Sequence, residues 1–159
     1  MASFASKLVT LIGMVMSLNG CQSPGDGPSV GNLAFAGLGD TTWQLVEFQS
    51  MDDSQGTTRM SHPGKYTIEF RRDGSVAVRL DCNRGVGTWS NPIANASGGT
   101  LEFGPMAVTK AYCPPPSFGA QLEQHLRYVR SFIVRDGRLA MSLMADGGIL
   151  VWEPAGKQD

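Results

Sequence analysis

The first indication of the fold is the stretch Tyr66–Leu80, with the sequence YTIEFRRDGSVAVRL. Apolar and polar side chains alternate in both halves of this stretch, as they do in half-buried strands. Asp73-Gly74 lies between the halves and favours a tight hairpin turn, and the adjacent Arg71-Arg72 can make the loop longer than two residues. The sequence therefore predicts an antiparallel β-hairpin with one face in the core.

A second turn is predicted immediately after this hairpin, in the stretch Leu80–Trp89, LDCNRGVGTW. We expect the strand to end, a tight irregular turn to follow, and a second strand to begin. Asn83 and Thr109 carry short polar side chains of the kind that bond backbone groups where regular ladder bonds fail. Gly85 and Gly87 are expected to permit the backbone path of the turn.

The rest of the chain extends this pattern. Short β-prone runs are expected at 42–48, 100–103, 132–134, 139–143 and 149–152, with polar loops at 50–64 and 90–99 and an extended segment at 106–113. One helix is predicted after Ser117, because Leu122, Leu126 and Val129 recur at helical spacing. The predicted fold is mainly β (α+β): a compact antiparallel β-barrel or curled sheet of about 7–9 short strands, with one helix packed at one side.

The amino-terminal segment has the order of a secretory signal, with Lys7 ahead of a short apolar run. Leu18 to Cys21 resembles the lipobox of bacterial lipoproteins, which implies cleavage before Cys21 and acylation of its sulfur. The expected layout is a signal peptide at 1–20, an acylated flexible tether at 21–40, a domain at 41–154 and a tail at 155–159. The alternative is an ordinary cleaved signal in which Cys21 is incidental.

Two observations bear on location and partners. Gln22 follows Cys21 where an aspartate would signal inner-membrane retention in enteric bacteria, so in a two-membrane organism the outer membrane, facing the periplasm, is favoured. Cleavage would remove Lys7 and leave 12 basic against 14 acidic residues. A net charge near −2 without a basic cluster gives no footprint for nucleic acid.

Several residue patterns together resemble the META domain family, typified by the bacterial heat-shock lipoprotein HslJ. The matching marks are Trp43 with Leu45, Phe70 with Asp73-Gly74, Cys82-Asn83-Arg84 with Gly87, Phe103–Met106, Thr109 with Cys113, Glu123, and Asp146-Gly147. Asp81 stands where the family usually has glycine, and Gly85-Val86 where an aromatic residue is common. The resemblance implies a compact antiparallel β-structure with a helix and a place in the cell envelope. It implies no settled enzymatic activity, and it associates the chain with stress tolerance, virulence and pilot-like lipoproteins.

The cysteine count indicates a structural use. With Cys21 acylated, Cys82 and Cys113 remain as a pair in an oxidising compartment, which favours a disulfide. The alternative is a reactive thiol with His125 as its base. A packed or boundary histidine is the more common situation for such a helical residue, and His62 stands alone in a loop without a second metal ligand at suitable spacing.

Candidate catalytic groups are few. Of the carboxylates Asp73, Asp81, Glu102, Asp136 and Asp146, three lie in predicted turns, where aspartate is favoured for backbone reasons. No phosphate loop, zinc spacing, serine elbow or dinucleotide fingerprint occurs, so neither a metal nor another cofactor is expected.

Three function hypotheses follow. The first is a non-enzymatic envelope lipoprotein, held at the membrane through acylated Cys21, that supports envelope integrity or stress tolerance through a protein partner or apolar ligand. The second is a lipid or acyl-chain carrier, or a secretion-pilot-like lipoprotein, with a barrel interior lined by Phe70, Leu80, Leu101, Phe103 and Met141. The third is an enzyme using Asp81, His125 or Cys113.

Overall fold

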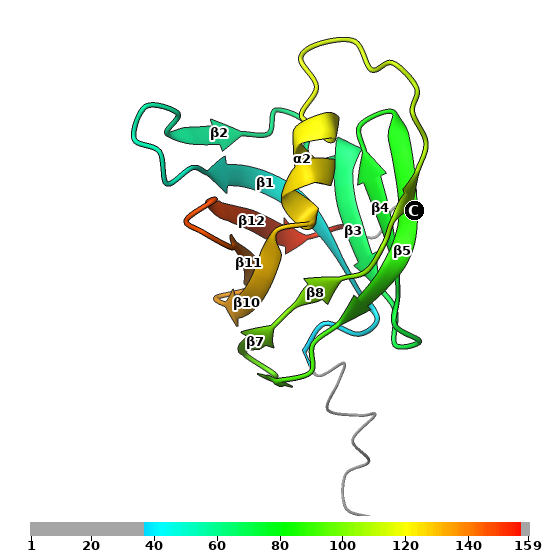
Figure 1. Cartoon of the computed structure of the whole chain (residues 1–159), viewed down its shortest axis with the longest axis vertical. Helices are drawn as coiled ribbons and strands as arrows, with labels where there is room; N and C mark the ends of the chain where they lie inside the picture. The colour runs from blue at the N-terminus through cyan, green and yellow to red at the C-terminus, as the bar shows by residue number, and fades with distance from the viewer. Residues whose placement is uncertain (1–36, 157–159) are drawn as a thin grey trace, which may run out of the picture.

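The computed structural model describes residues 37–156. The predicted signal peptide, Cys21 and most of the predicted tether therefore lie outside the described residues. The described chain forms one strongly curled antiparallel sheet with a single α-helix against its open side (Figure 1). The elements are β1 (Thr41–Gln49), β2 (Thr57–Arg59), the 3₁₀ turn η1 (Pro63–Lys65), β3 (Tyr66–Phe70), β4 (Ser75–Leu80), β5 (Asn83–Ser90), β6 (Ala94–Asn95), β7 (Gly98–Thr100), β8 (Glu102–Phe103), β9 (Ala107–Val108), α2 (Gly119–Leu126), β10 (Val129–Arg135), β11 (Arg138–Leu143) and β12 (Ile149–Pro154).

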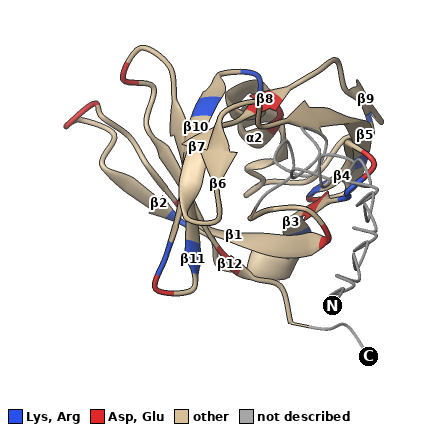
Figure 2. Cartoon of the chain, turned by 90° about the horizontal axis from the view of Figure 1, so that it is seen from below, with Lys and Arg blue, Asp and Glu red and all other residues tan. Residues whose placement is uncertain are grey.

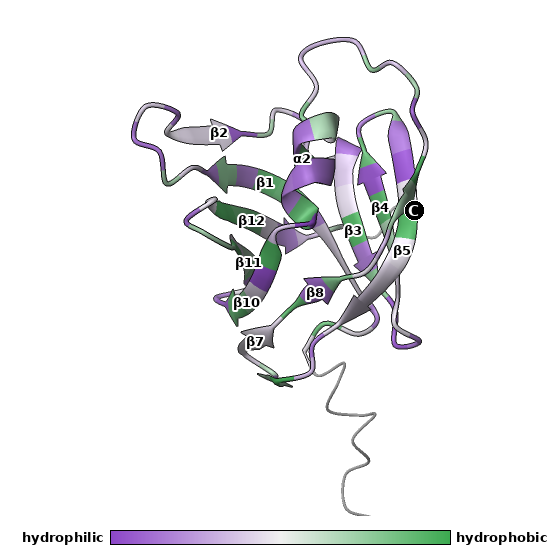
Figure 3. Ribbon diagram, in the orientation of Figure 1, coloured by the Kyte–Doolittle hydropathy of each residue, from purple (hydrophilic) through white to green (hydrophobic). Residues whose placement is uncertain are grey.

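The predicted hairpin is confirmed as β3 and β4. Tyr66 pairs with Leu80 and Phe70 with Val76, and every second side chain on both strands is buried. Hydrophobic and hydrophilic positions alternate along these strands (Figure 3). The connection is a four-residue loop, because the Arg71 N–H donates to the Ser75 carbonyl at 3.0 Å and Asp73 Oδ1 accepts from the Ser75 N–H at 2.8 Å.

The sheet is closed by a segment that the sequence indicated only in part. Gly98–Thr100 pairs with β10, and Glu102–Phe103 pairs with β5 at the other end of the strand order. Between them Leu101 is fully buried, and its N–H donates to the Arg130 carbonyl at 3.0 Å. Residues 98–103 thus cross from one side of the curled sheet to the other and turn it into a barrel-like shell.

The fold class is the predicted one, but the described residues hold 12 strands, more than the expected 7–9. The excess comes from strands of two or three residues, such as β2 and β6, in segments predicted to be loops. Their few side chains carry no periodic signal, and tertiary pairing alone makes them strands. The segment predicted to be extended from Met106 to Cys113 contains only the two-residue strand β9.

Three boundaries differ from the prediction. Val129, which the helical spacing included, lies in β10 and pairs with Leu143, because the helix ends at Leu126. Leu38 is fully buried, and Thr41 donates from its backbone N–H to the Leu38 carbonyl, so residues 37–40 belong to the folded body instead of the predicted tether. Helix α2 begins after Phe118, one residue later than a Ser117 cap would place it; the Ser117 hydroxyl accepts from the Gly119 N–H at 3.3 Å.

Helix α2 covers the open side of the sheet with its buried residues Leu122 and Leu126. Its first residue lies directly against the end of β4, because a β-carbon added at Gly119 would lie 2.5 Å from the Leu80 carbonyl oxygen. On the same helix, the His125 ring stacks on Phe48 with centroids 4.4 Å apart. The helix is therefore fixed to the sheet at both ends.

Candidate functional site

The turn between β4 and β5 is as tight as predicted. Leu80 pairs directly with Asn83, so Asp81 and Cys82 form a two-residue connection. Asp81 has φ of +64°, a left-handed conformation that aspartate tolerates better than most residues. Its N–H donates to the Lys65 carbonyl at 2.8 Å.

The Asp81 carboxylate is only 7% exposed and lies 3.1 Å from the Lys65 ammonium. A hydrogen bond from Ser117 is the largest influence lowering the pKa of Asp81, and Lys65 lowers it further. The carboxylate therefore joins three segments of the chain as an ionised structural group.

Cys82 and Cys113 are bonded in a disulfide. It ties the β4–β5 turn to the loop that leads into α2. The thiol chemistry considered for these residues would require this bond to be broken.

Hydrogen bonds from the Asn83 side chain hold the same loop in a second way. Its side-chain Nδ2 donates to the Ala111 carbonyl at 2.9 Å, and its Oδ1 accepts from the Ala111 N–H at 2.8 Å. The amide thus pairs with a backbone residue as a neighbouring strand would. Nδ2 also lies 3.3 Å from Cys113 Sγ, and Thr109 Oγ1 donates to Asn83 Oδ1 at 2.9 Å.

Thr109 completes this arrangement. Its N–H donates to the Arg84 carbonyl, and its hydroxyl accepts from the Arg84 N–H, both at 3.0 Å. Asn83 and Thr109 thus bond backbone groups in the manner the sequence predicts.

Gly85 and Gly87 have a different role from the one predicted. Both lie within β5 and neither has a positive φ, so they do not shape the turn. A β-carbon at Gly85 would lie 2.7 Å from Val78 Cγ2, and one at Gly87 would lie 2.9 Å from the Pro105 carbonyl oxygen. These glycines permit β4 and the segment around Pro105 to pack closely against β5.

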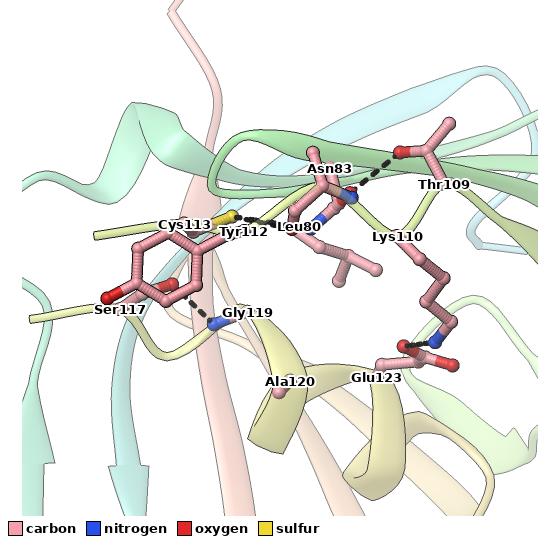
Figure 4. Close-up of a pocket in the computed structure, with 11 residues that line it drawn as sticks. Leu80, Asn83, Thr109, Lys110, Tyr112, Cys113, Ser117, Gly119, Ala120 and Glu123 are labelled. Carbon is pink, nitrogen blue, oxygen red and sulfur yellow. Dashed lines mark hydrogen bonds and ion pairs between the residues drawn. The ribbon is translucent and has the colours of Figure 1, made fainter. Parts of the chain in front are cut away.

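A half-open pocket of about 320 Å³ lies beside this linked loop (Figure 4). One wall is the segment Thr109–Cys113, and the other is the start of α2 with Ala120 and Glu123. Tyr112 stands at its edge with 83% of its surface exposed, the largest fraction among the described large apolar side chains. An adjacent pocket of the same volume continues along α2 between Phe103–Met106 and Arg127.

Glu123 lies between the two pockets and lines both. Its carboxylate accepts from Lys110 Nζ at 2.6 Å and from Arg127 at 3.0 Å. The hydrogen bond from Lys110 is the main reason that the pKa of Glu123 is lowered. Two cations therefore share one carboxylate, and the pair of pockets carries a net positive charge.

The five residues predicted to line an apolar pocket belong to the packed interior instead. Phe70, Leu80, Leu101 and Met141 are at most 1% exposed, and Phe103 packs against them. They come from β3, β4, the 98–103 segment and β11, and they fill the curled sheet. At the surface, Leu80 reaches one of the two pockets beside α2 and Phe103 the other.

The other candidate groups are dispersed. Burial lowers the pKa of His125, which stacks on Phe48 as a packed histidine. Asp73, Asp136 and Asp146 lie in turns, and Glu102 lies on β8. Within residues 37–156 there is no group of three or more His, Cys, Asp or Glu side chains arranged to hold a metal.

Basic and acidic residues are spread over several elements of the described chain (Figure 2). None of the helices described is long and apolar enough to span a bilayer.

The order of marks noted in the sequence, from Trp43 to Asp146-Gly147, now falls on one continuous fold. The sequence model of the META domain matches residues 36–155. The chain belongs to the META domain family. In this META domain, the positive φ of Asp81 is the conformation for which glycine is best suited.

Solved structures share the fold at low identity. An NMR structure of a protein from Burkholderia xenovorans is 18% identical, with a TM-score of 0.59 over 92% of this chain and 100% of that one. A crystal structure of a DUF4847 family protein from Bacteroides vulgatus is 15% identical, with a TM-score of 0.53 over 77% of this chain and 96% of that one. A search of curated proteins found no match.

Sequence reasoning missed Lys110 and Tyr112 as members of this site. Both lie in a segment without periodicity, and their position follows from the disulfide and the Asn83 bonds. The one available signal was that Tyr112 directly precedes Cys113, a residue of the family pattern, in the sequence.

Proposed function

We propose that this protein is a non-enzymatic lipoprotein of the bacterial cell envelope whose META domain supports envelope integrity or stress tolerance by binding a partner protein. Acylation of Cys21 anchors it, with the outer membrane facing the periplasm as the preferred location. Residues 22–36 then connect the anchor to the folded domain.

The observation that carries this proposal is the exposure of Tyr112 on a loop that is held in place. Tyrosine supplies a large contact area at a low cost in conformational entropy and is enriched among residues that dominate binding energy. The loop is fixed by the disulfide at Cys113 and by the Asn83 amide at Ala111. A fixed loop loses less entropy on association, so it favours binding.

A non-enzymatic role is supported by how the polar groups at this site are used. Asn83 bonds through both ends of its amide, Thr109 bonds to Asn83 and Arg84, and Asp81 bonds to Lys65. Their hydrogen-bonding capacity is taken up by the fold. An enzyme at this position would need a nucleophile or base with an available lone pair directed into the pocket.

The carrier hypothesis has less support. A closed small barrel is normally filled by its own side chains, and the residues expected to line a lipid cavity lie in the packed core. The two pockets beside α2 are lined by charged and polar groups as well as apolar ones, which suits a peptide better than an acyl chain.

The decisive experiment places a photo-crosslinking amino acid at position 112 in cells under envelope stress. The matched control places it at Tyr128, which is 45% exposed and follows the far end of α2. We expect one envelope protein to be crosslinked from position 112 and not from position 128, and Tyr112→Ala to lower survival under detergent stress while Tyr128→Ala does not. Equal crosslinking from both positions, or full survival of Tyr112→Ala, would overturn the proposal.

The anchor is tested separately by labelling cells with radioactive palmitate. We expect label on the wild-type protein and none on Cys21→Ala. Unlabelled wild-type protein, or label that persists in Cys21→Ala, would contradict acylation at this residue.

A further inference from the structure

The segment that walls the pockets beside α2 has an unused sheet edge. Strand β9 pairs with β5 on one side, and it has no second strand partner among the described residues. Thr109 donates its N–H to β5, so the alternation of an antiparallel ladder turns the N–H of Val108 away from β5. The backbone N–H groups of Met106 and Lys110 have no hydrogen-bond partner within residues 37–156.

These groups adjoin a groove, which we define as the two consecutive pockets between residues 103–113 and α2. Residues 109–113 line one pocket and residues 103–106 line the other, with β9 between them in the chain; residues of α2 and Arg127 line the opposite side. An extended peptide lying in this groove could receive backbone hydrogen bonds from every second residue of the wall. This is the geometry of strand addition to a sheet edge.

The net positive charge of the groove favours an acidic occupant. Lys110 and Arg127 are 70% and 69% exposed, and both bond to the single carboxylate of Glu123. The lowered pKa of Glu123 keeps that carboxylate ionised at neutral pH, so the groove has one cation in excess. An incoming carboxylate can bond to either exposed cation while Glu123 retains the other.

Apolar subsites accompany the charged ones. Phe103 and Met106 line the pocket near Arg127, and Tyr112 borders the pocket near Lys110. Figure 4 shows Lys110 reaching across to Glu123. Successive side chains of an extended segment point to opposite sides, so a segment that alternates acidic and apolar residues presents its acidic side chains on one side and its apolar side chains on the other.

We propose that the groove between β9 and α2 binds an extended acidic segment of a partner protein, which adds as a strand to the free edge of β9. This inference rests on the proposed function, since it specifies how the partner is held. It adds the chemistry of the bound segment and the backbone groups that recognise it.

The test titrates the intact protein, purified in mild detergent, with the blocked peptide acetyl-Thr-Glu-Val-Glu-Thr-amide and follows backbone amides by NMR. We expect the amides of Met106, Val108 and Lys110 to shift and to exchange more slowly with solvent. The amide of Ala94, on the short edge strand β6, serves as the internal control and should not move. The lysine counterpart, acetyl-Thr-Lys-Val-Lys-Thr-amide, should bind about fivefold more weakly, and added salt should reduce the difference.

Surface variants test the charge argument without touching the core. Glu123→Gln leaves two cations and should bind the acidic peptide about fivefold more tightly, provided Lys110 and Arg127 stay in place. The double change Lys110→Gln and Arg127→Gln leaves one carboxylate and should reverse the preference towards the lysine peptide. Thermal unfolding of each variant verifies that it is folded.

The proposal is overturned if millimolar acidic peptide causes no shift of the groove amides, if both peptides bind equally, or if the double variant keeps the preference for the acidic peptide. Groove amides protected only at high protein concentration would identify a second copy as the occupant, and protection lost on deleting residues 21–36 would identify the chain's own tether; either would also overturn it. If crosslinking from position 112 succeeds while the peptide fails, the proposed function stands and the groove inference falls. If the peptide binds but no partner is crosslinked, the proposed function falls and the peptide specificity of the groove stands.

Discussion

Exchanging one atom of the Asn83 side chain should weaken the domain in a pH-dependent way. In Asn83→Asp, the oxygen that accepts from the Ala111 N–H and from Thr109 is retained. The Nδ2 donor is replaced by an oxygen 2.9 Å from the Ala111 carbonyl. The hydrogen bond to the Ala111 carbonyl and the weaker contact with Cys113 Sγ are lost, and two oxygens are forced together, so we expect a loss of about 1.5 kcal/mol in the free energy of unfolding at pH 7.

The expected change in melting temperature follows from the size of the domain. An unfolding entropy of about 2.1 cal/mol/K per residue over about 120 folded residues converts 1.5 kcal/mol to a decrease of about 6 °C. The introduced carboxyl can donate to the Ala111 carbonyl only when protonated, so its pKa in the folded state is raised above the unfolded value of about 3.9. The hydrogen bond is thus fully restored below pH 3.9 and is lost as the pH rises through the folded pKa.

The assay is thermal unfolding of wild type and variant side by side between pH 3.5 and 7. The difference between the two proteins cancels the titration of shared groups such as Asp81 and Glu123. Asn95→Asp is the matched control, because Asn95 uses its Oδ1 as an acceptor from Ser97 and Gly98, and this oxygen is retained. A deficit at position 83 that is constant with pH, or as small as that at position 95, would refute this account of the Asn83 amide.

Three further outcomes are expected. Replacing Cys82 and Cys113 by Ser should lower stability by roughly 3–4 kcal/mol in the chain-entropy model, and the difference from wild type in urea unfolding should vanish once reductant is added. Gly119→Ala should lower stability by about 1–3 kcal/mol despite its gain in helix propensity, because the new β-carbon would overlap the carbonyl at the end of β4. Gly64→Ala is its control, since nothing lies within 4 Å of that added atom. Burial lowers the folded pKa of His125, so stability should fall as the pH drops below the unfolded value of about 6.5, and His125→Phe should flatten that slope between pH 5 and 7.

The parts of the fold that could be predicted are those encoded by local periodicity. The alternation in Tyr66–Leu80 specifies a hairpin because both strands have one buried face, and Asp73-Gly74 marks the turn between them. Gly98–Thr100 gave no such signal, since its pairing with β10 depends on a segment some 30 residues later. Short strands of this kind exist because of their tertiary partners.

The candidate site could be predicted only in part for the same reason. A disulfide between Cys82 and Cys113 followed from counting, and a backbone-bonding role for Asn83 followed from its chemistry. The partner of Asn83, Ala111, could not be identified, because any backbone amide can fill that role. Glycine serves both in turns and where another group packs close to the backbone. Gly85 was assigned to the turn, but it has the second role, because a β-carbon there would collide with Val78.

The pairing of β1 with β12 places the first and last strands of the domain side by side, with the Ala155 N–H bonded to the Thr42 carbonyl. During synthesis, one edge of β1 therefore stays uncovered until β12 has been made. The region from β3 to Cys113 can meanwhile form its strands and its disulfide. A chain stopped before β12 would expose the long edge of β1, which is the kind of surface that aggregates or attracts chaperones and proteases. The sheet of this domain is therefore complete only after β12 has paired with β1.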